Sequence, residues 1–240
     1  MARSRTPDRP PVILTPIPPG QLPAVLLRFE AALGDSRGRA VFATIAATAA
    51  ERAEGDRAET HRQQALNLVR RFRMGVAEGP PAIGFSWDGE ALRADTEAYV
   101  LLHEVAHYQL AAPARRRVVD FGLGAGPETG ARAAAERAAV LFGVAREREE
   151  AMASLLGILW EVTLGHPALA SFLDQNWLEG AGSPGAARHF TRILAALQQQ
   201  GFAAPDGRPT MRLRVGADDP EEPRRLLAQN AAGRLVEEVD

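Results

Sequence analysis

The sequence contains no cysteine. This absence excludes disulfide bonds, thiolate metal ligands and cysteine nucleophiles, and it fits a cytosolic protein. Long hydrophobic runs are also missing, because the most apolar stretches, such as residues 151–160, are too short to cross a bilayer. The basic N-terminal segment MARSRTPDRPP is not followed by an apolar signal core. We therefore expect a cytoplasmic protein without a membrane-spanning segment.

The chain also lacks an excess of charge of one sign. Its formal net charge is −2, so we expect no direct binding of nucleic acid by the molecule as a whole. Apolar residues make up 46 % and charged residues 24 %, a balance typical of globular proteins. A length of 240 residues is enough for one domain with a substantial core.

Composition divides the chain into three segments. Seven prolines fall within residues 1–23, and proline fixes φ and removes a donor, so we expect a mobile, extended arm there. Residues 24–214 carry helical patterns and should form one helical domain, in which Val25, Leu26 and Phe29 begin the first apolar stripe. Residues 215–240 are acidic and interrupted by proline, so we expect a loosely attached tail.

The fold class expected from these patterns is mainly α, a single α-helical domain. Ile83, Phe85 and Trp87 alternate before an Asp88-Gly89 turn signal, which predicts a short β hairpin or strand near residues 82–90. Asp95 or Thr96 is expected to cap the helix over 96–111, which stops before Pro113. Besides the helix that starts at residue 24, we expect helices over residues 38–55 (closed by Gly55), 58–75 (closed by Gly75), 96–111, 131–164 (interrupted near Gly143) and 185–201 (ended by Gly201).

Residues 103–107 read His-Glu-Val-Ala-His, and residues four apart lie on one face of a helix. His103 and His107 can therefore present two imidazoles to one metal ion, as on the metal helix of a zincin-like protein. Glu104 lies about 100° around the helix from His103, where it would reach the open side of the metal as a catalytic group. The alternative is that both histidines are ordinary polar residues on a helix surface.

The third ligand of such a site is usually a carboxylate from a later helix. Glu147, Glu149, Glu150 and Glu161 are the candidates, and Glu147 and Glu150 share a face from which Glu149 points away. Small and apolar residues follow Glu150, which makes it our candidate, with Glu147 in reserve; the alternative is a solvated charged turn. We expect the other histidines to be exposed (His61) or structural (His166 and His189).

Two further segments near the motif need an interpretation. Arg115 and Arg116 belong to a basic cluster that is either a solvated chain segment or a docking patch for an acidic macromolecule. Residues 122–130 are rich in glycine, but they lack the Gly-Lys-Ser/Thr ending of a phosphate loop, so we do not interpret them as one.

The block LHEVAHYQLAAPARRRVVDFG resembles the elongation factor P hydroxylase family. The family's His-Glu-x-x-His is followed by Ala-Arg-Arg-x-x-Val-Asp-Phe-Gly, and residues 114–122 supply those letters here. The resemblance centres on residues 102–122 and continues more weakly to about residue 167, where counting back from Gly165 favours Glu150 as the family's third ligand. It implies a non-haem iron enzyme that hydroxylates a modified lysine of elongation factor P, an acidic protein partner.

The chain also departs from this family. Residues 123–130 replace the family's aromatic segment and Pro-Asp-Gly turn, the Pro-Gln pair after the second glutamate is absent, and the helices before residue 82 have no counterpart. The metal site can therefore carry over while recognition of the substrate has changed.

Two histidines and one carboxylate suit both zinc and iron(II), and spacing alone does not choose between them. The neighbouring block favours iron(II) and a hydroxylase. The alternatives are a zinc-dependent peptidase in which Glu104 deprotonates water, and a non-catalytic binding protein with a drifted site. Asp120 is expected behind the site, accepting a hydrogen bond from a ligating histidine, unless it pairs with the 115–117 arginines. Arg115 and Arg116 are expected to flank the opening to a protein substrate.

Overall fold

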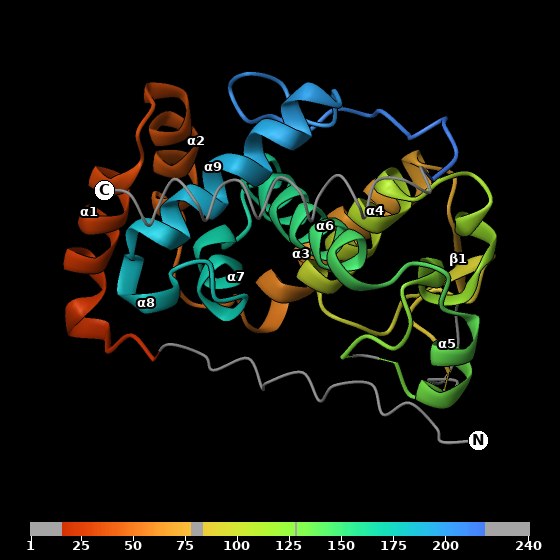
Figure 1. Cartoon of the computed structure of the whole chain (residues 1–240). Helices are drawn as coiled ribbons and strands as arrows, with labels where there is room; N and C mark the ends of the chain where they lie inside the picture. Colours follow the sequence, from red (N-terminus) through yellow and green to blue (C-terminus); the bar gives the residue numbers. More distant parts are fainter. Residues whose placement is uncertain (1–15, 78–83, 128, 219–240) are drawn as a thin grey trace.

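The computed structural model describes residues 16–77, 84–127 and 129–218, and this part of the chain is mainly helical with a small two-stranded parallel sheet (Figure 1). In chain order the elements are η1 (Pro19–Gln21), α1 (Leu22–Ala32), α2 (Ser36–Ala46), α3 (Gly55–Arg71), β1 (Gly75–Ala77), β2 (Ala91–Arg93), α4 (Ala98–Leu110), η2 (Arg115–Arg117), η3 (Val119–Gly122), α5 (Arg132–Ala138), α6 (Gly143–Leu164), α7 (Ala168–Asp174), α8 (Glu179–Gly182) and α9 (Pro184–Gln199).

Helix α4 lies between α3 and α6 at the centre of the molecule (Figure 1). Its apolar residues, including Leu101 and Val105, are fully buried, as the sequence predicts for this helix. Gly157 of α6 faces α4, where an added Cβ would lie 3.3 Å from Cα of His103. The missing side chain allows the two helices to approach closely at the residue that begins the metal motif.

An aromatic cluster fills the core between α1, α2, α7 and α9. The rings of Phe29, Phe42, Phe172 and Phe190 lie with centroids 4.7–6.4 Å apart, mostly edge to face or tilted. Val25 and Phe29 of the predicted first stripe are buried, which confirms that stripe for α1. Gly201 follows α9 with φ of 75°, as expected for a glycine that ends a helix.

Two helix boundaries differ from the prediction. The helix expected over 38–55 ends at Ala46, because the chain after it is docked on α7: Oγ1 of Thr48 accepts a hydrogen bond from N of Leu169, and O of Ala49 accepts one from N of Ala170. Gly55 begins α3 and does not close α2. Tertiary contacts thus override a helical sequence pattern here.

The position of Gly75 and the N-cap of α4 also differ from the prediction. Gly75 belongs to β1, where an added Cβ would lie 2.4 Å from O of Glu90, so glycine permits the close pairing of β1 with β2. The residue that precedes α4 as its N-cap is Glu97, without a side-chain capping bond, so the prediction of Asp95 or Thr96 was wrong. The interruption near Gly143 is confirmed, because α5 ends at Ala138 and α6 begins at Gly143.

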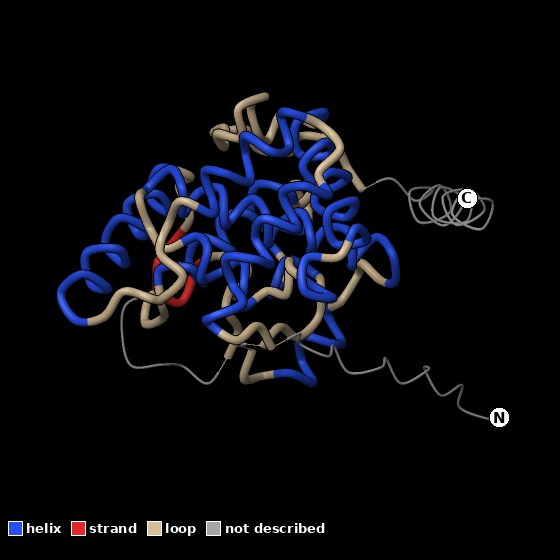
Figure 2. The backbone as a smooth tube through the Cα atoms, turned by 90° about the vertical axis from the view of Figure 1, so that its left-hand side faces the viewer, coloured by secondary structure: helices blue, strands red, loops and turns tan. Residues whose placement is uncertain are grey.

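The β structure lies at one side of the helices (Figure 2) and only partly matches the prediction. Strands β1 and β2 pair in parallel, whereas Phe85 and Trp87 lie in neither strand. Trp87 forms a single antiparallel bridge with Leu92 around the predicted Asp88-Gly89 turn, so the turn is confirmed and the strand is not. Ile83 lies outside the described residues.

Residues 210–214 lie beside the C-terminal part of α4 and are hydrogen-bonded to Gln109. The fully buried Gln109 donates from Nε2 to O of Thr210 (2.8 Å) and O of Arg212 (2.9 Å), and its Oε1 accepts from Nε1 of Trp160. This amide therefore joins α4, α6 and the C-terminal segment. Most of the predicted arm (1–15) and tail (219–240) lies outside the described residues. Among the helices that are described, none has the length and apolar character needed to cross a membrane.

A second polar cluster lies far from the metal motif, between α3, α6 and α7. His61 is buried, contrary to the prediction that it is exposed, and its ring stacks on that of His166 with centroids 4.1 Å apart. Burial lowers the pKa of both histidines. His166 also contacts Gln64 through Nε2, at 2.8 Å, which agrees with a structural role for this residue.

Replacing the buried Glu161 by glutamine should stabilise the protein at pH 8 but not at pH 4.5. Burial raises the pKa of Glu161 to about 7, although the hydrogen bond to Ser171 and the charge of Arg52 act in the opposite direction. A carboxyl group whose pKa is raised on folding stabilises the fold below its unfolded pKa, and this stabilisation is lost as the pH rises towards 7. Glu161→Gln should therefore increase the free energy of unfolding at pH 8 by up to about 3 kcal/mol. Urea unfolding at both pH values tests this; an equal effect at both would contradict it.

Candidate metal centre

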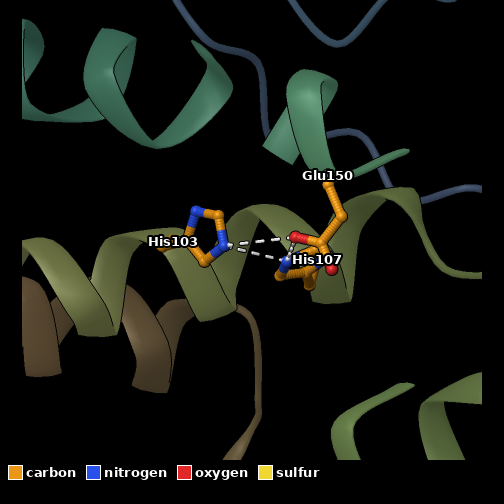
Figure 3. Close-up of side chains that lie close together, drawn as sticks. All are labelled: His103, His107 and Glu150. Carbon is orange, nitrogen blue, oxygen red and sulfur yellow. Dashed lines mark hydrogen bonds and ion pairs between the residues drawn. The ribbon is translucent and has the colours of Figure 1, made fainter. Parts of the chain in front are cut away.

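His103 and His107 lie one turn apart on α4, and both rings point toward α6 (Figure 3). Their Nε2 atoms are 3.0 Å apart, and the rings are nearly perpendicular, with centroids 4.5 Å apart. The ring of His107 is buried, whereas that of His103 is 27 % exposed. The two nitrogens therefore converge on one point, as the spacing in the sequence predicts.

Glu150 reaches the same point from α6 (Figure 3). Its Oε2 lies 3.4 Å from Nε2 of His107 and 3.9 Å from Nε2 of His103. Ligand atoms bound about 2.1 Å from one ion, at tetrahedral or octahedral angles, are about 3.0–3.4 Å apart. The three side chains offer ligand atoms within 4.8 Å of one another, so this group could hold a metal ion with little rearrangement.

The protonation states of the three residues depend on one another. Burial and the neighbouring His107 together lower the pKa of His103 to about 3, although Glu150 acts in the opposite direction, so this ring is neutral. Burial acts to raise the pKa of Glu150, but the two histidines outweigh it and lower the value to about 2. For His107, burial acts to lower the pKa, but the nearby carboxylates, chiefly that of Glu150, together have the larger effect, so the pKa of His107 is raised. A proton on His107 and the carboxylate of Glu150 therefore balance each other, and a metal ion bound by both imidazoles would replace this proton.

The three residues lie in the wall of a cavity of about 720 Å³. Helices α4, α6 and α9 line it together with residues 120–121, 123–127, 129, 175–177 and 179. Glu104, the predicted catalytic residue, is 8 % exposed and also lines this cavity. The glycine-rich segment that the sequence left without a function thus forms part of the cavity wall next to the metal ligands.

Acidic side chains dominate the charged lining of this cavity. Among the described residues that line the cavity, Arg146 on the first turn of α6 contributes the only guanidinium. The carboxylates come from both helices and from the surrounding loops, namely Glu104, Asp120, Glu147, Glu150 and Glu179. Such a lining attracts a cationic ligand and disfavours an anionic one.

Asp120 makes neither of the contacts expected from the sequence. Its carboxylate accepts hydrogen bonds from N of Ser86 (3.1 Å), N of Trp87 (3.3 Å) and Oγ1 of Thr129 (2.7 Å), and not from a histidine or an arginine. Nδ1 of His107 is buried and has no hydrogen-bond partner among the described residues. The prediction that Asp120 holds a histidine directly was wrong, because its carboxylate turns toward the 86–87 backbone.

Asp120 instead holds a strained turn. Asp120 and Phe121 are both in the left-handed region, with φ of 43° and 54°, which costs of order 1–3 kcal/mol for each residue. The turn places the ring of Phe121 between Trp87 (centroids 5.5 Å apart, 8° between planes) and His107 (5.7 Å, 22°). This contact of Phe121 with a metal ligand was not predicted from the sequence, although the Asp-Phe-Gly letters pointed to the segment.

Replacing Asp120 by alanine should lower the free energy of unfolding by about 3 kcal/mol. The change leaves the buried donors of Ser86, Trp87 and Thr129 without their acceptor, and each such group costs about 1–3 kcal/mol. Asp120→Asn keeps an acceptor oxygen for the two backbone groups and should cost less than half as much. Chemical denaturation of both variants measures the difference, and equal losses would show that the carboxylate does not anchor the turn.

The two arginines expected at a docking surface do not form one. Arg115 is buried, with 3 % of its side chain exposed, and it pairs with Glu149 and Asp218. Arg116 is partly buried and donates to O of Tyr108 (2.8 Å) and O of Arg214. Both guanidiniums are used inside the protein, so the prediction that they flank an opening is not supported. Glu149 points away from the two histidines, as predicted, because it binds Arg115.

Comparisons with protein family models, with curated proteins and with solved structures each found no match. The features that bear on function are therefore the geometry of the metal centre, the cavity around it and the resemblance in the sequence.

Proposed function

We propose that this protein is a non-haem iron hydroxylase that acts on a lysine, in native or modified form, of a protein substrate similar to elongation factor P. The observation that carries the proposal is the convergence of His103, His107 and Glu150 at the wall of an acidic cavity. Two histidines and one carboxylate that leave further positions open form the ligand set of many iron(II) oxygenases.

The block that resembles the hydroxylase family supports the proposal through its place in the structure. Phe121 of this block stacks on His107, Asp120 lines the cavity, and Arg115 binds the residue before Glu150. The letters that carry the resemblance thus surround the metal ligands and are not scattered over the surface.

The cavity suits the side chain that this reaction requires. A lysine ammonium group entering from a partner would meet the carboxylates of Glu104, Glu147 and Glu179, which compensate for the loss of its hydration. A bound iron(II) ion would supply the redox chemistry for activating molecular oxygen. The reaction consumes one O₂, two electrons and two protons from a reductant; one oxygen atom enters a C–H bond of the lysine and the other leaves as water.

Glu104 is placed to handle protons in either of the reactions considered. It lies next to His103 in sequence, lines the cavity and is largely buried. In the hydroxylase it would serve as a proton relay beside the metal, and in a zinc peptidase it would deprotonate water. A peptidase also needs a cleft beside a strand edge. Of the β-structured region, only Ser86 is among the described residues that line the cavity, which favours the hydroxylase.

Incubation of the iron-loaded protein with lysine-modified elongation factor P, ¹⁸O₂ and a reductant should add one labelled oxygen atom to the factor. The chain itself has no lysine, so any hydroxylated lysine in the digest must come from the substrate. The Glu150→Gln variant is the control, and the unmodified factor, incubated in parallel, shows whether the native lysine is also a substrate. Cleavage of an unfolded protein by the zinc-loaded form, with no mass change in the factor, would favour the peptidase. Absence of both reactions at full metal occupancy would indicate a different substrate, in line with the altered sequence of residues 123–130.

A further inference from the structure

The guanidinium of Arg115 connects three parts of the chain, namely helix α6, the 120–121 turn and the C-terminal segment at Asp218. It donates from Nη1 to Oε1 of Glu149 (2.9 Å), with a second bond from Nη2 to Oε2, and from Nη1 to O of Phe121 (2.8 Å). Its Nε donates to Oδ2 of Asp218 at 2.7 Å. The side chains of Arg115 and Glu149 are 3 % and 8 % exposed, so this is a buried, two-pronged ion pair.

Two of these three attachment points, Glu149 and Phe121, are adjacent to residues of the metal centre. Glu149 immediately precedes the ligand Glu150 on α6, and Phe121 carries the ring that stacks on the ligand His107. One rigid, planar group therefore fixes the start of α6 and the strained 120–121 turn relative to each other. A shift of either part would move a ligand of the metal or its neighbour.

We propose that Arg115 and Glu149 are positioning residues of the metal centre: their ion pair holds Glu150 at the distance from His103 and His107 that a metal needs. This inference rests on the metal site of the proposed function. It gives Arg115 a role inside the protein, in place of the docking role expected from the sequence. Groups that orient metal ligands from behind typically contribute about 10- to 100-fold to metal affinity.

The contribution of the pair to positioning can be separated from its contribution to stability. Replacing a buried ion pair by apolar residues of similar volume is often neutral or stabilising. The double variant Arg115→Met/Glu149→Met should therefore remain folded, with a melting temperature close to or above that of the native protein. It should nevertheless bind Zn²⁺ and Co²⁺ about 10- to 100-fold more weakly, and its Co²⁺ absorption spectrum should change.

The matched control is the double variant Arg52→Met/Glu161→Met. This pair also joins a buried glutamate of α6 to an arginine, with 3.5 Å between Nη1 and Oε1, but Glu161 lies about 16 Å along the helix from Glu150. Its removal should change the melting temperature and leave the Co²⁺ spectrum and metal affinity unchanged. An equal loss of metal affinity in the control would overturn the positioning role.

The remaining outcomes are also decisive. If the Arg115→Met/Glu149→Met variant binds metal with native affinity and spectrum, the positioning role is wrong and the proposed function stands. If the native protein itself binds no divalent metal, the positioning role and the proposed function are both wrong. Glu149→Gln covers the case in which the double variant does not fold: this change keeps the shape and one hydrogen bond, and it should weaken metal binding by a smaller factor. Native affinity in that variant would overturn the proposal.

Discussion

Replacing Glu150 by glutamine should lower the affinity of the protein for a divalent metal by at least about 100-fold, because loss of a direct ligand exceeds the effect of groups that only orient ligands. Oε2 of Glu150 lies 3.4 Å from Nε2 of His107 and 3.9 Å from Nε2 of His103. Glutamine keeps the shape of the side chain but removes the charge that a cation between two neutral imidazoles requires. Titration of the metal-free protein with Zn²⁺ or Co²⁺ measures the loss.

The matched control is Glu147→Gln. Glu147 lies one turn before Glu150 on α6 and lines the same cavity, but it does not belong to the three-residue group. Loss of one exposed charge is worth at most about 1 kcal/mol, which corresponds to less than about fivefold in affinity. Equal losses in the two variants would show that charge in the cavity, and not ligation by Glu150, governs metal binding.

Replacing Phe121 by alanine should lower the free energy of unfolding by about 3–5 kcal/mol, the usual cost of deleting a buried aromatic ring. Phe121 is 1 % exposed and lies between the rings of Trp87 and His107. Its removal also frees the ring of His107 to rotate, since Nδ1 of that ring has no hydrogen bond to hold it. The fraction that remains folded should therefore bind metal more weakly than the native protein.

Phe29→Ala separates these two effects. Phe29 is equally buried, but it belongs to the aromatic cluster of α1, α2, α7 and α9. Its replacement should cost a similar 3–5 kcal/mol and leave the metal affinity of the folded protein unchanged. Urea denaturation gives the stability of each variant, and metal titration without urea gives the affinity. Weaker metal binding in both variants would attribute the effect of Phe121 to global stability alone.

The sequence predicted the parts of the fold that depend on local patterns. The apolar stripes of α1 and α4, the break before Gly143 and the stop at Gly201 follow from helical periodicity and from glycine geometry. Residues 47–54 look helical, but they are not, because Thr48 and Ala49 bond to α7. That contact joins residues far apart in the chain, so no local pattern shows it.

The same distinction holds for the metal centre. His103 and His107 were predictable because one turn of helix fixes their relation, and Glu150 was selected by its surroundings and by the family resemblance. The partners of Asp120 and Arg115 were not predictable, since both side chains are captured by distant groups: the backbone at Ser86 and Trp87, and the carboxylates of Glu149 and Asp218. The sequence alone does not show whether a charged residue near a motif faces the site or holds neighbouring segments in place.

The metal content of the protein purified without oxygen is the most direct test of the central claim. The account predicts about one iron(II) per chain, bound by His103, His107 and Glu150 and lost in the Glu150→Gln variant. A folded native protein that takes up neither iron nor any other divalent metal would contradict the metal centre. One tightly bound zinc per chain that iron(II) cannot replace would support the metal centre but contradict the proposed hydroxylase activity.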